Sequence, residues 1–154
     1  MSLDLEYLSS YVEIRQLNST YNRLADDGNG DAYSLLFTED AEFNIVGNRI
    51  YRGRKEIASA ASATKVAVHI TTEPELEITG TRAKQRVRML TFYRAPGGTQ
   101  NDFVATGWYI DELKHRDEGW RYYRRRVELD LKIDKVLEKM TVKEAFDKLL
   151  KEEG

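Results

Sequence analysis

The first part of the chain has apolar residues at the spacing of an α-helix. Between residues 4 and 26 they recur every three or four positions, and neither Gly nor Pro interrupts them. Gly28, Asn29 and Gly30 then tolerate positive φ and end a helix. The pattern therefore predicts a first helix over about residues 4–26. A short second helix is expected to begin with Asp31 as its N-cap and to carry residues 35–37 on its apolar side.

After residue 40 the apolar period becomes two, which indicates β-strands. Strands are predicted over about residues 41–46, 65–79, 82–93, 102–115 and 120–131, and residues 53–64 suit a short helix rich in Ala and Ser. The turns between the later strands are too short for parallel crossovers, so these strands should pair antiparallel. Pro74 falls inside the predicted strand 65–79, which places that strand at an edge or bends it there.

Helices followed by a run of strands make the fold class α+β. Strands of ten or more residues tend to coil, so we expect the N-terminal helices to pack on a strongly curved antiparallel sheet. A further amphipathic helix is predicted over about residues 133–151, with an apolar stripe that includes Val142, Phe146, Leu149 and Leu150. We expect one domain over residues 4–131 and a C-terminal helical extension over residues 132–154.

Composition removes several classes of function. The 154 residues carry 24 basic and 26 acidic side chains, a near balance that gives no electrostatic reason to expect nucleic acid or an anionic membrane as partner. The absence of Cys excludes disulfides, zinc–thiolate sites and a cysteine nucleophile. No apolar run reaches the ~20 residues that span a bilayer, and the N-terminus is too charged for a signal peptide. These features predict a cytoplasmic protein.

His69 is the most informative polar residue. The chain has no Gly-rich phosphate loop, no dinucleotide fingerprint and no Gly-x-Ser-x-Gly motif, and its two histidines lie outside any metal-binding spacing, so we expect no metal. His69 alternates with Val68 and Ile70 and shares the opposite strand face with Ala67 and Thr71. On the concave side of a curved sheet it would point into a cavity. A buried structural histidine fits the same pattern equally well.

Tyr21 and Asp26 are the candidates on the first helix. Tyr21 continues the apolar stripe and should face the core or a cavity. Asp26 lies five residues later, about 140° around a regular helix. A carboxylate at the end of a helix opposes the helix dipole, which is unfavourable for a purely structural residue and favours a function. An exposed C-terminal carboxylate is the alternative.

Several segments together resemble the SnoaL-like branch of the nuclear transport factor 2-like superfamily. The likeness follows the order and spacing of residues 13–17, Tyr21, Asp26, and residues 35–41, 51–57, 68–71 and 119–127. It covers about residues 8–130 and implies a cone-shaped α+β barrel around a deep, mostly apolar pocket. The relatives include scytalone dehydratase, bile acid 7α-dehydratase, polyketide cyclases, steroid isomerases and a dehydrochlorinase.

The resemblance implies an Asp–His dyad formed by Asp26 and His69, with Tyr21 as a pocket tyrosine. A carboxylate bonded to one imidazole nitrogen fixes the tautomer and stabilises the imidazolium that forms when the other nitrogen takes a proton. This chemistry needs no metal or organic cofactor. The resemblance therefore predicts an enzyme with no cofactor.

One feature departs from the relatives. Dehydratase-type members often carry a pocket arginine near the end of the last strand, where this sequence has Glu128. Arg124 and Arg126 share its alternation face and are candidates to replace or pair with it, whereas Arg125 is expected to be solvated or ion-paired. The remaining candidates for substrate binding, which fit a core role equally well, are Phe43, Met89, Tyr93, Trp108 and Tyr122.

The leading hypothesis is a cofactor-independent lyase, a dehydratase acting on a small polycyclic or aromatic alcohol. His69 would remove a proton, Asp26 would orient His69, and Tyr21 would polarise or protonate the leaving oxygen. The rivals are an isomerase or polyketide cyclase using the same dyad, a non-catalytic ligand-binding protein, and a protein like the small subunit of ring-hydroxylating dioxygenases. The expected partners are a small hydrophobic hydroxylated ligand and further copies of the chain.

A homodimer is expected, with a trimer as the alternative, because the outer face of the curved sheet needs cover. Trp108, Ile110 and Val127 are the residues predicted to lie on that face.

Overall fold

The computed structural model describes residues 4–62, 67–94 and 101–131. The chain begins with α1 (Leu5–Asp27), which Asp4 caps by accepting a hydrogen bond from the Tyr7 backbone N–H at 2.7 Å. Gly28 ends the helix in the left-handed conformation, with φ of 64°. The predicted first helix is therefore present, with both predicted ends within a residue or two.

The second helix is shorter than predicted and lies earlier. It is α2 (Gly30–Ser34), and its N-cap is Asn29, whose side chain accepts a hydrogen bond from the Ala32 backbone N–H. Phe37 instead opens β1 (Phe37–Ile45), where its side chain is fully buried. The prediction of a helix through residues 35–37 was wrong: Leu35 is exposed beyond the end of α2, and only Phe37 is buried, at the start of β1. Periodicity over so few residues does not distinguish a strand start from a helix.

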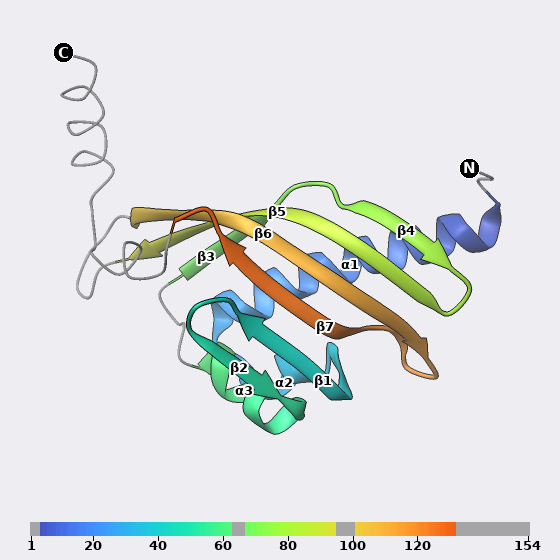
Figure 1. Ribbon diagram of the computed structural model, residues 1–154, viewed down its shortest axis with the longest axis horizontal. Helices are drawn as coiled ribbons and strands as arrows, with labels where there is room; N and C mark the ends of the chain where they lie inside the picture. Colours follow the sequence, from blue (N-terminus) through green and yellow to red (C-terminus); the bar gives the residue numbers. More distant parts are fainter. Residues whose placement is uncertain (1–3, 63–66, 95–100, 132–154) are drawn as a thin grey trace, which may run out of the picture.

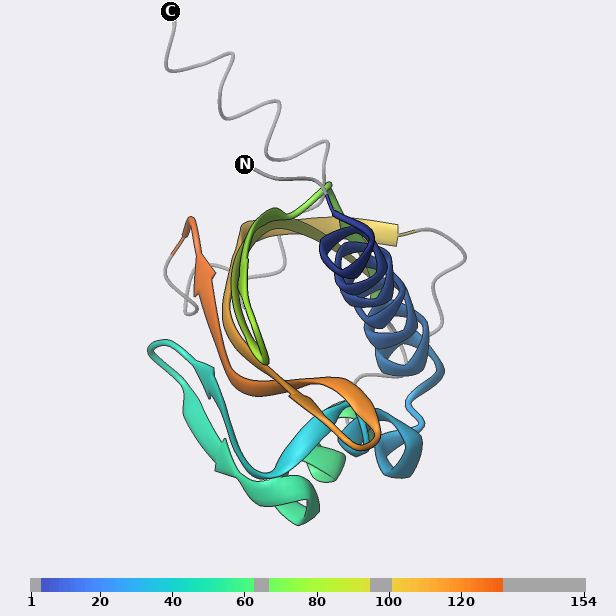
Figure 2. The same ribbon diagram turned by 90° about the vertical axis from the view of Figure 1, so that its right-hand side faces the viewer.

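Seven strands form one strongly curved sheet. After β1 come β2 (Arg49–Arg52), α3 (Gly53–Ser62), β3 (Ala67–Thr71), β4 (Glu75–Thr79), β5 (Arg82–Arg94), β6 (Asn101–Arg116) and β7 (Gly119–Leu129). Their order is β2-β1-β7-β6-β5-β3, with β4 also paired to β5. The sheet curls around α1 without closing, and α1 lies along its concave side (Figures 1 and 2).

Two details of the sheet differ from the sequence prediction. The predicted strand 65–79 is divided into β3 and β4, with Pro74 in the interruption, and β3 lies at one end of the sheet. The sheet is also mixed rather than antiparallel, because β1 pairs with β7 in parallel. Nearly the whole chain separates these two strands, so no short turn forces them to run in opposite directions.

The core fills the space between α1 and the concave face of the sheet. From β5 and β6 the inward residues alternate strictly, for example Val87 and Met89 opposite Tyr109 and Gly107. Ile14, Leu17, Tyr21 and Leu24 of α1 pack onto them. The α+β class and the curved sheet with helices on its inner side are thus confirmed. The predicted C-terminal helical extension, residues 132–154, lies outside the described residues.

β7 carries an irregularity that changes which side chains face the core. Glu112 pairs with Arg124 and Leu113 with Tyr122, so Tyr123 is one extra residue on β7, a β-bulge. Before the bulge, Trp120 and Tyr122 are buried; after it, Arg125 and Val127 are buried. Val127 therefore faces the core, and its predicted place on the outer face was wrong. Trp108 does lie on the outer face, stacked against Arg86 and Arg88.

Gly107 permits the close approach of β6 to β7. A Cβ added there would lie 2.2 Å from the backbone oxygen of Glu128 and 2.9 Å from the Cα of Leu129. These are backbone atoms, which cannot move aside as a flexible side chain can. The close approach of β6 to β7 therefore depends on the absence of a side chain at this position.

We predict that Gly107→Ala lowers the free energy of unfolding by about 1–3 kcal/mol, because strand β7 must shift to admit the methyl group. Urea denaturation followed by circular dichroism measures this change. Gly80→Asn is the control, since Gly80 has φ of 55° and open space around it, and Asn tolerates that conformation. Equal stability of Gly107→Ala and the wild type would contradict the close approach of the strands.

Homo-oligomerisation stays a prediction. The outer face of the sheet, which was expected to form the contact, is only partly apolar. This face carries Trp108 together with many charged side chains, and the exposed apolar residues of the chain include Val46, Ile50 and Ile70. A dimer should sediment at about twice the 17.8 kDa of the chain, and a trimer at three times. A monomer alone at micromolar concentration would exclude both.

Candidate functional site

Asp26 and His69 are in direct contact. The last turn of α1 carries Asp26 to β3, where its Oδ1 accepts a hydrogen bond from the backbone N–H of His69 at 2.9 Å. The same oxygen lies 2.7 Å from Nδ1 of the His69 ring. The side chains of Asp26 and His69 are 27% and 13% exposed, so the pair is accessible yet largely enclosed. The hydrogen-bonded pair expected from the sequence is present.

This geometry sets the tautomer of His69. An ionised carboxylate only accepts hydrogen bonds, so the proton of the neutral imidazole must lie on Nδ1, toward Asp26. Nε2 then carries the free lone pair. If Nε2 takes up a proton, the adjacent carboxylate stabilises the imidazolium. The arrangement is that of an oriented general base.

A second link holds α1 against β3 one helical turn earlier. The amide nitrogen of Asn22 donates to the hydroxyl of Thr71 at 3.0 Å. Asn22 precedes Asp26 by four residues, about 6 Å along a helix, while Thr71 follows His69 by two residues, about 6.6 Å along a strand. The two spacings match. The dyad is therefore one of two parallel contacts that fix the helix against the edge strand.

Tyr21 lies in a buried aromatic cluster rather than at the surface. It is 3% exposed, and its ring packs against Tyr33, Tyr109 and Tyr122 at centroid distances of 4.9, 5.5 and 5.6 Å. Burial, together with the charge of Tyr21 and a hydrogen bond to it, raises the pKa of Tyr33 well above its ordinary value. Burial also raises the pKa of Tyr122. The phenols of Tyr33 and Tyr122 therefore stay protonated and can act as hydrogen-bond donors.

Arg125 lies at the centre of this cluster, which the sequence did not reveal. Its guanidinium carbon is 4.0 Å from the ring centroid of Tyr21, 4.1 Å from that of Tyr109 and 3.9 Å from that of Tyr122. Nε and Nη2 of Arg125 donate to the two carboxylate oxygens of Asp111 at 2.8 and 2.7 Å. Both side chains are almost completely buried.

The ion pair continues into a polar network that reaches α1. Gln85 donates to Asp111 at 2.6 Å and to the side-chain oxygen of Asn18 at 2.9 Å, and the Tyr122 hydroxyl donates to the same Asn18 oxygen at 2.6 Å. Burial opposes the charge of Arg125, but the Asp111 carboxylate outweighs it and raises the pKa of the guanidinium. A permanently charged arginine is therefore enclosed in the core. The expectation that Arg125 is solvated was wrong, although it is ion-paired.

The other predicted substrate-binding residues divide between the two faces of the sheet. Phe43, Met89 and Tyr122 are buried on the concave side with the core. Tyr93 pairs through its backbone with Ala67, and its side chain lies outside the described ones. Trp108, Arg124, Arg126 and Glu128 lie on the convex side, where Arg124 pairs with Glu112 and Arg126 with Glu128.

The bulge at Tyr123 explains where the residues of β7 lie. Counting by twos from the buried Trp120 and Tyr122 places residues 124, 126 and 128 on the inner face, but the extra residue reverses the alternation. The four convex-side residues do not share the face that carries His69, and they drop out of the candidate site. An arginine on the inner face of β7 is present after all, at Arg125.

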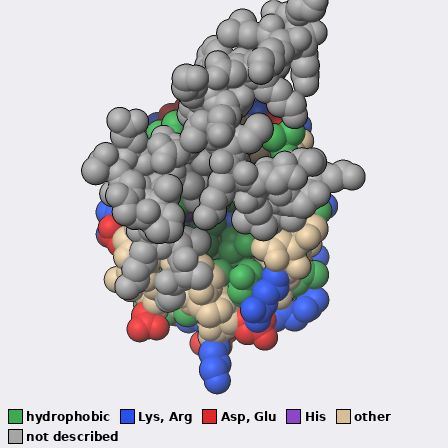
Figure 3. All heavy atoms as spheres, turned by 90° about the vertical axis from the view of Figure 1, so that its left-hand side faces the viewer, with side chains coloured by type: hydrophobic (Ala, Val, Ile, Leu, Met, Phe, Trp, Pro, Cys, Tyr) green, Lys and Arg blue, Asp and Glu red, His purple; other side chains and the backbone are tan. Residues whose placement is uncertain are grey.

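The cavity predicted beside the dyad stays a prediction. Two surface depressions, of about 250 and 330 Å³, are lined by described residues, and neither Asp26 nor His69 lines them. Figure 3 views the end of the molecule where β6 begins and β7 ends, and hydrophobic side chains gather in the middle of that face. Within the described ranges no three acidic or histidine side chains group to hold a metal ion, and no helix could span a membrane.

Comparisons with known proteins agree with this architecture. The model of the SnoaL-like domain matches residues 6–126. A protein of unknown function from Mycobacterium tuberculosis is 26% identical, covers 86% of this chain and 78% of its own, and superposes with a TM-score of 0.74. A putative scytalone dehydratase from Novosphingobium aromaticivorans is 20% identical, with 80% and 86% covered and a TM-score of 0.69.

LinA superposes with a TM-score of 0.74 at 22% identity, with 83% of this chain and 90% of LinA covered. Another similar structure, of type 2 LinA, is named a hexachlorocyclohexane dehydrochlorinase. At these identities the likeness of the dehydratase and of LinA concerns the fold. No curated protein matches the chain significantly.

We predict that Asp111→Leu lowers the free energy of unfolding by about 3–5 kcal/mol, because it leaves the buried Arg125 charge without its partner. Urea denaturation measures the loss. Adding Arg125→Met should recover part of it, since an apolar pair needs no charge compensation. Glu112→Leu, at the neighbouring exposed position, is the matched control and should change stability little. A single variant more stable than the double variant would argue against the ion pair.

Proposed function

Since the chain belongs to the SnoaL-like domain family, we propose that it is a lyase that removes water from a small polycyclic or aromatic alcohol without a cofactor. The observation that carries this proposal is the contact between Asp26 and Nδ1 of His69, which leaves Nε2 as an oriented base. Names of similar structures support an elimination. One is a putative scytalone dehydratase, and another is a dehydrochlorinase, so both names describe loss of a small molecule from a carbon skeleton.

The proposed reaction begins with His69. Nε2 removes a proton from carbon, the C–H electron pair forms the new C=C bond, and the bond to the neighbouring hydroxyl oxygen breaks with its electrons moving to that oxygen. The oxygen leaves as water once an acid has supplied a proton. Asp26 keeps Nδ1–H pointed toward itself throughout and stabilises the imidazolium.

Tyr21 is the proposed acid. It lies on α1 five residues before Asp26, within the buried cluster that borders the inner face of the sheet. The guanidinium of Arg125 is stacked on the Tyr21 ring. Phe43 and Met89, buried on the same side of the sheet, are the proposed apolar contacts for the carbon skeleton.

An isomerase or polyketide cyclase would begin with the same proton abstraction and differ only in the later steps. Product analysis by mass spectrometry separates these reactions, since loss of water changes the mass and isomerisation does not. A ligand-binding protein would bind the panel compounds without turnover. A protein like a dioxygenase small subunit would co-purify with an iron-containing large subunit; one similar structure is named a putative aromatic ring hydroxylase.

We predict that His69→Ala and Asp26→Asn each reduce turnover by about 10²–10⁴-fold, the usual contribution of an oriented general base. The assay incubates hydroxylated steroids, naphthols and polyketides with the protein in D₂O and monitors both product and deuterium incorporation by NMR. Deuterium exchange reports proton abstraction even where no elimination takes place.

Asn22→Ala is the matched control. It removes the parallel contact between α1 and β3 and leaves Asp26 and His69 in place, so it should lower stability while turnover stays within about tenfold. Equal loss of turnover in Asn22→Ala and His69→Ala would show that the contact acts by holding the helix. Unchanged turnover in His69→Ala would exclude the dyad as the catalyst.

A further inference from the structure

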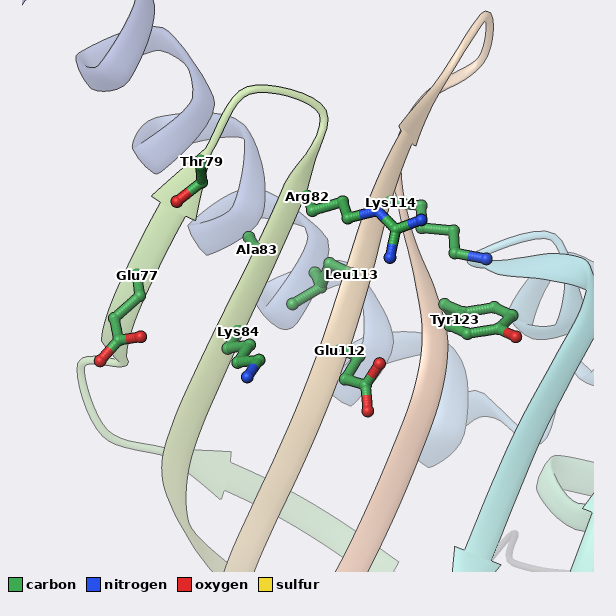
Figure 4. A pocket seen from close by; sticks show the side chains of 9 residues that line it. All are labelled: Glu77, Thr79, Arg82, Ala83, Lys84, Glu112, Leu113, Lys114 and Tyr123. Atoms are coloured by element: carbon green, nitrogen blue, oxygen red, sulfur yellow. The ribbon is translucent and has the colours of Figure 1, made fainter.

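The convex face of the sheet carries a depression on the side opposite His69. It has a volume of about 250 Å³, and strands β4 to β7 contribute its walls (Figure 4). Its charged and aromatic lining residues are Glu77, Arg82, Lys84, Glu112, Lys114 and Tyr123. None of these residues takes part in the function proposed above.

Two cations oppose each other in this depression. Arg82 of β5 and Lys114 of β6 are direct partners in the strand register. Like charges at opposed positions repel and destabilise a sheet. The Arg82 side chain extends across β6 toward Lys114 (Figure 4). Among the described residues, neither has a carboxylate within ion-pair distance.

The carboxylates that line the depression, Glu77 and Glu112, lie beside other cations than Arg82 and Lys114. Lys84 lies between Glu77 and Glu112 in the strand register, which balances its charge. Glu112 also pairs with Arg124 at 3.7 Å. The excess positive charge is therefore confined to the Arg82–Lys114 end of the depression.

A nearby carboxyl responds to this positive charge. The pKa of Asp40 is held below its usual value, chiefly by the nearby Thr38 hydroxyl and, to a smaller extent, by the charges of Lys114 and Arg116. Asp40 is exposed and does not come within ion-pair distance of Lys114 in the described structure. Lys114 therefore acts on an acidic group outside the strand pair, at a range longer than an ion pair.

The bulge on β7 holds one of the cations in position. Tyr123 is the extra residue, and it projects from the convex face. The Lys114 ammonium lies 3.1 Å from its ring centroid, and the guanidinium carbon of Arg124 lies 5.1 Å from it. The ring attracts both cations through its negative face. Figure 4 shows the Lys114 ammonium turned toward the Tyr123 ring and away from the Arg82 guanidinium, so the ring fixes where this cation lies.

We propose that the depression binds an oxyanion, the phosphate or carboxylate group of a small soluble molecule, between Arg82 and Lys114. The planar guanidinium of Arg82 offers two parallel N–H donors and the Lys114 ammonium a compact charge, which suits such a group. The bound anion replaces repulsion between the cations with attraction to both. The site is separate from the Asp26–His69 pair, so it does not depend on the proposed catalytic function.

The test is a titration of the full-length chain with inorganic phosphate, at low and constant ionic strength because salt screens exposed charges. Isothermal calorimetry gives the affinity, and thermal unfolding gives the shift in Tm. We expect phosphate to raise the Tm of the wild type. Arg82→Gln and Lys114→Gln should each weaken binding about tenfold or more, the usual value of a hydrogen bond to a charged group.

Lys55→Gln, at an exposed position of α3, is the control for the change in net charge and should bind phosphate as the wild type does. Without phosphate, Lys114→Gln removes both the repulsion from Arg82 and the attraction to the Tyr123 ring, so its stability should stay close to that of the wild type. A second arm with acetate separates the ligand classes: a stronger response to phosphate points to phosphate esters, and a stronger response to acetate points to carboxylates.

Two results would overturn the proposal. One is a response of the wild type to phosphate and acetate no larger than to chloride at equal ionic strength. The other is equal binding by the wild type and Lys114→Gln. Turnover by the Asp26–His69 pair should be unchanged in Lys114→Gln, so failure of either proposal leaves the other standing.

Discussion

The buried pair of Asp111 and Arg125 is the constraint on which most of the structure depends. Residues from three adjacent strands, Gln85, Asp111 and Arg125, form one row across the sheet, and Asn18 joins the row from α1. A charge can remain in a core only when it is paired and hydrogen-bonded. The network therefore demands a single register of β5, β6 and β7 and a single position of α1 above them.

The same constraint prepares the candidate site. The tyrosine rings that surround the Arg125 cation include Tyr21, so the middle of α1 is held at the sheet by attraction between cation and rings. From there the helix continues straight to Asn22 and Asp26, which meet the edge strand β3 at Thr71 and His69. The geometry of the dyad is thus set from two sides: by the packed core around Tyr21, and by the backbone N–H of His69 on the edge strand, which donates to Asp26.

The β-bulge at Tyr123 gives the two faces of the sheet their different chemistry. It brings Arg125 to the inner face, where the charge is paired and enclosed, and it leaves Tyr123 on the outer face beside Lys114. One inserted residue therefore decides both the composition of the core and the placement of the convex cations. Bulges have this effect because the side-chain period of a strand is two, so one extra residue reverses every later position.

The sequence alone determined what depends on local pattern: the long first helix and its end at Gly28, the α+β order, and the side of the strand on which His69 lies. The likeness to the SnoaL-like family added Asp26 as its partner. Only the tertiary structure decided the parallel pairing of β1 with β7, the division of the sheet's faces beyond Tyr123, and the burial of Arg125. Each of these depends on contacts between residues far apart in the chain, and periodicity within one segment carries no information about them.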